Sequence, residues 1–432
     1  MQPPDITSLQ APDGLSRRAR WAGGETIVST LMARTLAQPE LVSLAAGFVD
    51  HATLPLDALR TAIDFVWAKP NWARDALQYG TTIGYPPLRQ AILDRTLTAD
   101  GTASGASNLS AQQVVITAGS NQFLYLVGDA LLDAGDIILC GAPTYFVYLG
   151  TLTNLAARAV GVDVDDQGVI PDALEEQLRR HERNGELGRV KAVYLTTYYD
   201  NPTGTTIPAD RRARIVDIAK RWSRRHRIYV LEDVAYRELR YHDPDVPSML
   251  TCDPERNTVV QAGSFSKSFS PGVRVGWGIL PKSLLEPVLA AKGNIDFGSP
   301  NFNQVIMSAI VERGLFDEHI ASLREAYRKK LDATLEACDA FLGETDGVRW
   351  VRPGGGLYVW IRLPERIDTG LHGPLFDRAV AEGVLYVPGV CCFPPHGRPP
   401  QNNLLRLSFG IQSEEAIRRG IDALARAVKS VM

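Results

Sequence analysis

The strongest constraint on the fold of this chain is a repeated alternation between residues 113 and 264. Short apolar runs are followed by turn residues and then by stretches with the apolar spacing of a surface helix. The pattern predicts strands at 113–117, 136–140, 191–197, 227–233 and 257–264, and helices at 121–135 and 209–225. Strands joined through helices build a parallel sheet with helices on both faces. We therefore expect an α/β fold with a mostly parallel central sheet in a three-layer αβα arrangement.

The last third of the chain has a different pattern. A long helical stretch at 316–342 leads into the apolar segments GVRWV, GGGLYVWIRL, VLYVP and NNLLRLSFG, and a final helix covers 413–432. This order is typical of a smaller α+β domain, and 432 residues are more than one ordinary domain holds. We predict an N-terminal segment (1–45) that packs with the small domain or on a partner chain, a large domain (46–304) and a small C-terminal domain (305–432).

The composition argues against several classes of function. The net charge is −3, so no basic surface is available to hold nucleic acid. The five cysteines lack a CxxC pair, and the seven histidines lack the spacing of a metal site. The N-terminus has no apolar signal-peptide core, and no apolar run is long enough to span a membrane. We expect a protein of the reducing cytoplasm that uses no metal, nucleic acid or membrane.

Polar and charged side chains gather where the predicted strands end. In chain order these side chains are Ser120, Asn121, Asn201, Asp233, Tyr236, Ser264, Ser266 and Lys267. Ligands of open parallel sheets bind beyond the carboxyl ends of the strands. We therefore expect a single site that combines small hydroxyls, amides, a carboxylate, a phenol and one lysine.

Each of these groups alone has an ordinary structural explanation. Ser120 and Asn121 could simply begin a helix, and Asp233 could cap a helix or pair with an arginine. Tyr236 could be a core residue, and the NPTG sequence that contains Asn201 could be a plain turn. Together they match pyridoxal phosphate, which needs a lysine for its aldehyde, a cradle for its phosphate and an acid near its pyridine nitrogen.

Longer motifs appear in a fixed order along the chain. They are LQYGTTIGYPPLRQAI (77–92), ITAGSNQFLYL, PTYFVY, DNPTG, LEDVAY, GSFSKSFSPGVRVGW and NNLLRLSFG. On these motifs, residues 41 to 425 resemble the class I and II aminotransferases, which are fold-type I enzymes that use pyridoxal phosphate. The glycines at 354–356 and the segment 388–393 are similar to the branch that acts on 2-aminoadipate, aromatic and branched-chain amino acids.

The resemblance implies a role for each residue that faces the cofactor ring. Lys267 is expected to be the Schiff-base lysine, and Asp233 to pair with the pyridine nitrogen. Asn201 and Tyr236 are expected to bind the ring hydroxyl oxygen, and Tyr145 to stack on the ring. Lys267, Asp233, Tyr236 and Asn201 are therefore the predicted catalytic residues.

The resemblance also implies a phosphate site and a substrate site. The residues expected to hold the phosphate are Ser120, Asn121, Ser264, Ser266 and Arg274. Asn121 stands where many relatives have the longer Gln, so its contact could be through the backbone alone. Tyr79 is expected to reach the phosphate of a neighbouring subunit, which requires a homodimer. Arg406 is expected to bind the substrate carboxylate, with Asn201 beside it and Gly47 allowing close approach to the backbone.

The expected reaction is a ping-pong transfer of the amino group of an L-amino acid to a 2-oxo acid, with 2-oxoglutarate as the expected acceptor. A pyridoxal-phosphate lyase, such as a C–S β-lyase, is the main alternative because the same scaffold supports it. A non-catalytic sensor fused to a DNA-binding module is disfavoured, since neither a helix-turn-helix segment nor a basic patch is present. Phe48, Trp21 and Phe297 are candidates for an apolar substrate pocket, with ordinary packing as the alternative.

Overall fold

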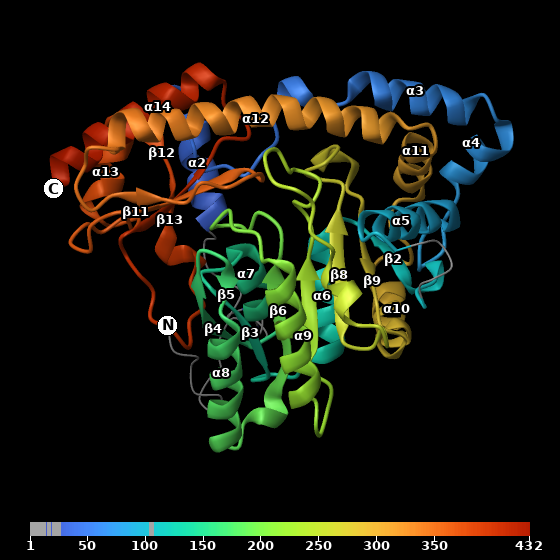
Figure 1. Cartoon of the computed structure of the whole chain (residues 1–432). Coiled ribbons are helices and arrows are strands. Elements are labelled where there is room, and N and C mark those ends of the chain that lie inside the picture. The colour runs from blue at the N-terminus through green and yellow to red at the C-terminus, as the bar shows by residue number, and fades with distance from the viewer. Residues whose placement is uncertain (1–13, 15–18, 20–26, 103–107) are drawn as a thin grey trace.

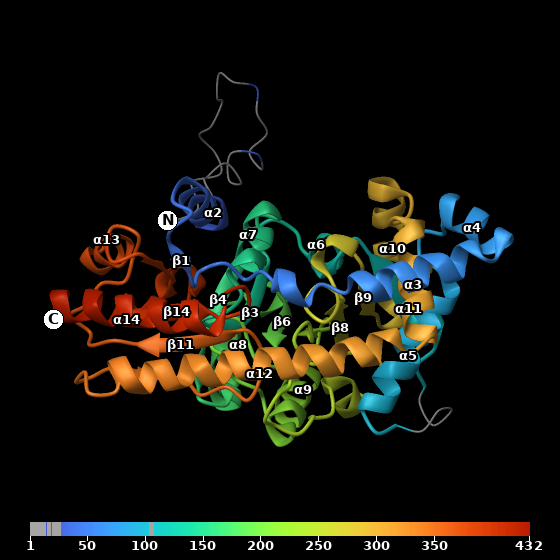
Figure 2. The same ribbon diagram turned by 90° about the horizontal axis from the view of Figure 1, so that it is seen from above.

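The computed structural model describes residues 14, 19, 27–102 and 108–432. These residues form two main sheets and the helices that cover them (Figures 1 and 2). Within these ranges, no helix combines the length and apolar character that crossing a bilayer requires. The same ranges contain no group of His, Cys, Asp or Glu side chains placed to hold a metal ion.

The larger sheet has eight strands. Their bounds are Val114–Thr117 (β2), Ile137–Ala142 (β3), Arg158–Asp165 (β4), Gly168–Val169 (β5), Val190–Thr196 (β6), Tyr229–Asp233 (β7), Val259–Ser264 (β8) and Gly276–Ile279 (β9). The spatial order is β2-β9-β8-β7-β6-β3-β4-β5. The strands from β8 to β4 run parallel, whereas β9 is antiparallel to both neighbours and β5 is antiparallel to β4. The predicted α/β class with a mostly parallel central sheet is confirmed.

Helices cover both faces of this sheet. Their bounds are Pro86–Ala99 (α5), Ser120–Leu131 (α6), Phe146–Asn154 (α7), Pro171–Arg183 (α8), Ala209–Trp222 (α9) and Lys282–Asp296 (α10). Helices α6, α7 and α10 share one core cluster with the sheet, and α5, α8 and α9 share the other. In β3, Ile137 and Leu139 belong to one cluster while Ile138 and Cys140 belong to the other. The strand is continuously apolar because its successive side chains are buried on opposite faces.

A second sheet is built from C-terminal residues. Its antiparallel strands are Arg349–Trp350 (β10), Tyr358–Arg362 (β11), Val387–Pro388 (β13) and Leu404–Ser408 (β14), in the order β10-β11-β14-β13. Helices α13 (Pro374–Ala381) and α14 (Glu414–Val431) pack against each other near this sheet. Strand β1 (Val42–Ser43), which follows α2 (Ile27–Ala37), pairs in parallel with β12 (Val384–Leu385). This pairing connects the N-terminal part of the chain to the C-terminal part.

One long helix runs beside both sheets. Helix α12 (Leu315–Leu342) has 28 residues and extends from α11 (Asn301–Glu312) at one end to α14 at the other, as Figures 1 and 2 both show. Helices α3 (Leu56–Trp67) and α4 (Pro70–Leu77) pack against α11. Short 3₁₀ helices lie at His51–Thr53, Ala111–Gln113, Leu187–Arg189, Met249–Cys252, Pro271–Val273 and Gly389–Cys392.

Helix α12 also fixes the loop that follows β1. Tyr327 accepts a hydrogen bond at its hydroxyl oxygen from the backbone N–H of Asp50 at 3.0 Å. Lys330 donates from Nζ to Oδ2 of Asp50 at 2.6 Å and to the carbonyl oxygen of Gly410 at 3.2 Å. The loop that carries Gly47 is therefore anchored to this helix through Asp50, which lies three residues after Gly47.

The larger sheet differs from the sequence pattern in detail. The helix predicted for 121–135 begins at Ser120 and ends at Leu131, and Gly135 lies in the following turn with a φ of +87°. Strands β4 and β9 were not predicted. Strand β9 reads Gly-Trp-Gly-Ile, and glycine weakens a strand signal. Gly278 is required there because a Cβ at this position would overlap the ring of Phe123.

Candidate active site

The predicted site residues meet in one cavity of about 290 Å³. It lies beyond the carboxyl ends of β6, β7 and β8, and its lining also includes residues of β11 and β14. The predicted residues that line it are Gly47, Ser120, Asn121, Tyr145, Asn201, Asp233, Tyr236, Ser264, Ser266, Lys267, Arg274 and Arg406. Parallel strands end at the same edge of a sheet, which brings these distant residues together. Tyr79, which the sequence predicted to bind the cofactor phosphate, does not line this cavity.

Lys267 is half-buried in the wall of the cavity, on the loop that follows β8. Its Nζ donates a hydrogen bond to the carbonyl oxygen of Gly47 at 2.6 Å. Burial lowers the pKa of Lys267, and the nearby cations of Arg406 and Arg274 lower it further. A lysine with a lowered pKa is more often unprotonated at neutral pH, which makes its amine a better nucleophile and base.

Asp233 is a buried carboxylate at the end of β7. Its Oδ2 accepts a hydrogen bond from the hydroxyl of Tyr194 at 3.1 Å, and its Oδ1 accepts one from the backbone N–H of Ala235 at 3.0 Å. Burial nevertheless raises the pKa of Asp233 to about 6. A cationic group opposite this carboxylate would favour its ionised form.

Arg406 lies on β14 and places a guanidinium in the cavity. Its Nη1 donates to Oδ1 of Asn201 at 2.7 Å, and its Nη2 donates to the carbonyl oxygen of Ala45 at 2.7 Å. Its Nε is buried and has no hydrogen-bond partner within the described part of the chain. Leaving a buried donor unpaired costs free energy, so this atom is suited to an acidic ligand such as a carboxylate.

The first turn of α6 forms a backbone cradle. Gly119 precedes the helix with a φ of +90°. A Cβ on Gly276, in the neighbouring strand β9, would overlap the backbone of Gly119 and Ser120. The two segments can approach this closely only because position 276 is a glycine, whereas glycine at position 119 permits the positive φ and leaves room for the guanidinium of Arg274. The cradle presents the N-terminus of a helix, where backbone N–H groups and the helix dipole favour an anion.

Polar side chains surround this cradle. Arg274 has a left-handed backbone with a φ of +48°, and its Nη2 donates to the carbonyl oxygen of Ala118 at 3.1 Å. The hydroxyl oxygen of Ser264 accepts a hydrogen bond from the backbone N–H of Ser266 at 3.0 Å. The guanidinium of Arg274 and the two serines line the same cavity as the start of α6, and together they provide donors suited to a phosphate.

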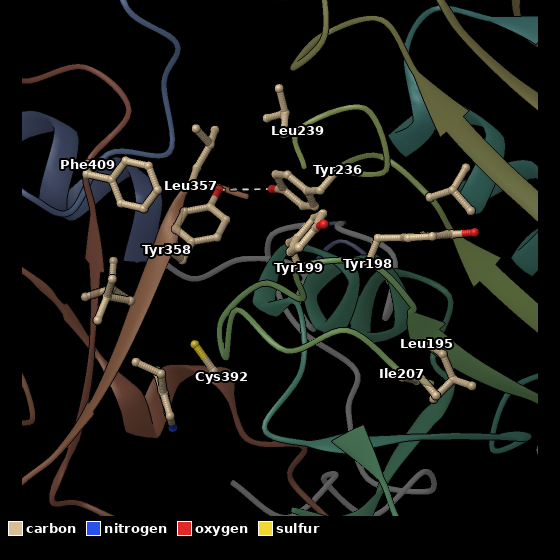
Figure 3. Close-up of a cluster of buried hydrophobic side chains, with 14 of the residues drawn as sticks. Leu195, Tyr198, Tyr199, Ile207, Tyr236, Leu239, Leu357, Tyr358, Cys392 and Phe409 are labelled. Carbon is tan, nitrogen blue, oxygen red and sulfur yellow. Dashed lines mark hydrogen bonds between the residues drawn. The ribbon is translucent and has the colours of Figure 1, made fainter. Parts of the chain in front are cut away.

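Two phenols border the space between the cradle and Arg406. Tyr145 precedes α7, and its hydroxyl lies close to the side chain of Asn121. The hydroxyl oxygens of Tyr236 and Tyr358 lie 3.0 Å apart, as Figure 3 shows. Burial raises the pKa of both Tyr145 and Tyr236. Both phenols therefore keep their protons at neutral pH and can donate hydrogen bonds.

Of the remaining residues that the sequence predicted for the site, some line the cavity and others lie on the surface. Phe48 lines the cavity. Tyr79 is 80% exposed and packs edge-to-face with Phe297, at 5.5 Å between ring centroids, and Phe297 is itself 62% exposed. Neither Tyr79 nor Phe297 lines the cavity of its own chain. Trp21 lies outside the described residues.

Sequence reasoning missed three aromatic residues of the site. Tyr358 and Phe146 line the cavity, and Tyr194 contacts Asp233 from β6. Tyr358 and Tyr194 lie inside apolar strand sequences, where an aromatic residue is typical of the core. A signal was present for Tyr358, because the glycines at 354–356 directly precede its strand.

Comparison with known proteins decides the family. A family model described as aminotransferase class I and II matches residues 39–424. The chain belongs to the class I and II aminotransferases. The aromatic-amino-acid aminotransferase 1 of Thermococcus litoralis is 36% identical, over 91% of this chain and 89% of the relative. The 2-aminoadipate transaminase of Thermus thermophilus is 33% identical, over 91% of this chain and 92% of the relative.

Comparison with solved structures also identifies aminotransferases. A kynurenine aminotransferase from Pyrococcus horikoshii, in complex with PMP, KYN as substrates and KYA as products, matches with a TM-score of 0.87 and 31% identity. The match covers 96% of this aminotransferase and 97% of that chain. PMP is the amine form of pyridoxal phosphate. The protein is thus a fold-type I aminotransferase that depends on pyridoxal phosphate, and the predicted family, cofactor and enzyme class are confirmed.

The residues of the cavity fit this cofactor. The first two residues of α6, Ser120 and Asn121, line the cavity, so the N-terminus of this helix is available to a phosphate. The buried carboxylate of Asp233 calls for a cation such as a protonated pyridine nitrogen. The lysine, the carboxylate and the cradle all line one cavity. Because both sequence relatives are named for amino-group transfer, transamination is favoured over the lyase alternative.

Proposed function

We propose that this enzyme moves the amino group of an L-amino acid with an aromatic or long apolar side chain to a 2-oxo acid such as 2-oxoglutarate, in a ping-pong reaction. One observation carries the proposal. The amine of Lys267, the carboxylate of Asp233 and the guanidinium of Arg406 line a single cavity. A covalent nucleophile, a partner for a pyridinium and a carboxylate receptor are the minimum that the reaction requires.

Lys267 is assigned the covalent attachment of the cofactor and the transfer of the proton on the substrate α-carbon. Pyridoxal phosphate, when bound, supplies an aldehyde that holds the amino group and a ring that accepts the electron pair left on that carbon. The lowered pKa of Lys267 supports its role as the base that takes this proton, because a protonated amine could not accept it. The bond from Nζ to Gly47 holds the amine in the cavity.

Three residues are assigned to the cofactor ring. Asp233 would keep the pyridine nitrogen protonated, and its hydrogen bonds to Tyr194 and Ala235 fix the position of the carboxylate. Tyr236 and Asn201 would bind the ring hydroxyl oxygen. The retained proton of Tyr236 and the bond from Arg406 to Oδ1 of Asn201 support this, since each leaves a donor free to point at an oxygen.

The phosphate is assigned to the cradle at the start of α6. Its proposed ligands are the backbone of Ser120 and Asn121 together with the side chains of Ser120, Ser264, Ser266 and Arg274. Tyr145 is assigned to one face of the ring, with its hydroxyl close to the side chain of Asn121. Fixed donors at a helix terminus bind a phosphate without reorganisation, which supports this assignment.

Arg406 is assigned to the substrate α-carboxylate. Its unpaired Nε and a second proton on a terminal nitrogen can form a bidentate pair with a carboxylate. Gly47 is assigned to the same subsite because its backbone lies against the cavity. The side chain of the substrate would lie against Phe48, Phe146 and Val147, which are apolar. The activity in the name of the Thermococcus litoralis relative supports an aromatic substrate.

We further propose a homodimer, in which Tyr79 of each chain serves the cavity of its neighbour. The exposure of Tyr79 and Phe297 supports this, since a large apolar ring on the surface of one chain is suited to an interface. A large domain at 46–304, a small domain at 305–432 and an N-terminal segment at 1–45 remain the proposed division of the chain. The five free cysteines support a reducing cytoplasm as the location.

The first experiment is to mix the pyridoxal-phosphate-loaded enzyme with single L-amino acids and to record its absorbance. We expect phenylalanine, tyrosine and tryptophan to convert the visible absorbance to that of the amine form fastest, with release of the matching 2-oxo acid. Addition of 2-oxoglutarate should restore the starting spectrum. Release of ammonia without conversion of the cofactor would contradict the proposal and favour a lyase.

A further inference from the structure

We propose that Tyr358 is a positioning residue for this reaction, which supports the carboxylate-binding arginine with its ring and supplies a hydrogen bond to Tyr236 with its hydroxyl. The inference rests on the proposed function, in which Tyr236 donates to the ring oxygen of the cofactor. Tyr358 is almost fully buried and lines the cavity. It comes from the smaller sheet, whereas Tyr236 follows β7 of the larger sheet.

The ring of Tyr358 is placed beside Arg406 by the register of β11 and β14. Trp360 lies opposite Arg406, and Tyr358 lies opposite Ser408. Opposite residues of an antiparallel pair share a face, so Tyr358 and Arg406 are diagonal neighbours on one face of the sheet. The guanidinium carbon of Arg406 is 4.3 Å from the centroid of the Tyr358 ring. A cation over an aromatic face is stabilised at this distance, and the ring therefore fixes the plane of the guanidinium.

The hydroxyl of Tyr358 points at Tyr236 across the gap between the two sheets (Figure 3). The two oxygens are 3.0 Å apart, and the rings pack edge-to-face with 5.6 Å between centroids. Each hydroxyl has one proton to donate. If Tyr236 donates its proton to the cofactor, the bond between the two phenols must be donated by Tyr358. Hydrogen bonds in such a chain polarise and strengthen one another.

The surroundings make room for this hydroxyl. A Cβ on Gly47 would come within 2.7 Å of the hydroxyl oxygen of Tyr358, so a larger residue at position 47 would displace it. The carbonyl oxygen of the same glycine accepts the bond from Lys267. The titratable and charged side chains that interact with the two phenols are Tyr145, Lys267, Tyr327 and Arg406. The site thus places one phenol at the meeting point of the lysine, the arginine and Tyr236.

The decisive variant is Tyr358→Phe, which removes the hydroxyl and keeps the ring. The readout is the pH midpoint of the absorbance change of the enzyme loaded with pyridoxal phosphate. A donor to the ring oxygen favours the form in which this oxygen is negative, so a weaker donor should raise the midpoint, by about half a pH unit. Tyr386→Phe is the matched control, because Tyr386 is also buried but bonds only the carbonyl oxygen of Thr369, at 3.0 Å, among the described residues.

A second variant, Tyr358→Leu, separates the two roles. It removes the ring as well as the hydroxyl, and we expect the KM for the amino acid to rise about tenfold, because Arg406 then keeps only the more distant ring of Phe146, at 5.4 Å. Tyr358→Phe should leave this KM unchanged. A rise in KM of equal size in both variants would overturn the assignment of the ring to Arg406.

A double-mutant cycle tests whether Tyr358 acts through Tyr236. In a Tyr236→Phe background, the further change Tyr358→Phe should not move the pH midpoint, whereas an additive shift would overturn the inference. A wild-type enzyme that does not bind pyridoxal phosphate with a visible absorbance would overturn the proposed function and the inference with it. A wild-type enzyme that titrates normally, with Tyr358→Phe and Tyr386→Phe at the same midpoint, would overturn the inference alone.

Discussion

The two sheets contribute to the site in different ways. The larger sheet supplies residues from the loops and helix ends that follow its strands, such as Ser120, Asn201 and Lys267. The smaller sheet supplies residues from within its strands, namely Tyr358 and Arg406. Loops can take the unusual backbone that a phosphate cradle needs, whereas a strand fixes the direction of a side chain by its register. On the proposed assignment, residues of the larger sheet bind the cofactor and residues of the smaller sheet orient the substrate.

Replacing Lys267 tests the larger sheet most severely. Lys267→Ala removes the only amine in the cavity that the described residues provide, and we expect turnover to fall by at least about 10⁴-fold. Lys191→Ala is a suitable control, because Lys191 pairs with Asp136 at 3.4 Å away from the cavity. Rates of 2-oxo acid release from a single turnover would measure the effect. Full turnover by Lys267→Ala would refute the assignment of Lys267 as the catalytic amine.

Asp233 allows a test by stability in the absence of cofactor. Its pKa is about 6 in the folded chain against 3.8 ordinarily, so the folded chain binds more protons between these values. The stability of the apoenzyme should therefore fall as the pH rises from about 4 through 6. Asp233→Asn removes this buried charge and should make the apoenzyme about 2–3 kcal/mol more stable at pH 7, with no gain below pH 4.

Urea unfolding at several pH values would measure this difference. The same variant should bind pyridoxal phosphate more weakly, because the amide cannot balance a pyridinium charge. Burial also raises the pKa of Asp200 to about 6, and the charge of Asp233 raises it further, so Asp233→Asn should lower the pKa of Asp200 and add to the gain in stability at pH 7. Equal stability of the two apoproteins across the pH range would contradict the prediction.

Arg406→Lys tests whether substrate binding by the smaller sheet is independent of cofactor binding by the larger sheet. A lysine cannot reproduce the bidentate pair, and we expect kcat/KM for the amino acid to fall by about 100-fold. The dissociation constant of pyridoxal phosphate should stay within about twofold of the wild-type value, because the cofactor contacts belong to the larger sheet. Arg398→Lys, which alters an ion pair with Asp163, serves as the control. A large loss of cofactor affinity in Arg406→Lys would show that the two sheets do not act separately.

Tyr79 provides the smallest expected effect and extends the comparison to a second subunit. Tyr79→Phe should weaken the binding of pyridoxal phosphate by about tenfold, the effect of one lost hydrogen bond to a phosphate. Mixed dimers of Tyr79→Phe and Lys267→Ala chains should contain one site with both changes and one site with neither. The intact site should bind cofactor as tightly as the wild type. Uniform weak binding in the mixed dimer would place Tyr79 in the site of its own chain.

The residues proposed for the cofactor could be brought to one site from the sequence pattern alone, whereas those proposed for the substrate could not. Lys267 and Asp233 were found because parallel strands must end at one edge, which the strand pattern alone reveals. The role of Arg406 depended on resemblance, since nothing in the sequence LLRLS indicates that this strand faces a cavity. Tyr194 and Tyr358 were missed because the direction of a strand side chain depends on tertiary packing. The placement of β9 was hidden by its glycines, although they allow the approach to α6.

The length of α12 has a consequence for how this chain can vary. A single inserted residue ahead of Tyr327 would rotate the rest of the helix by about 100° and shift it by about 1.5 Å. Tyr327 and Lys330 could then no longer both meet Asp50, unless the contacts of the helix with α11 or α14 were given up. We therefore expect a one-residue insertion or deletion in this helix to release the loop that carries Gly47 and to disturb the cavity that this glycine lines.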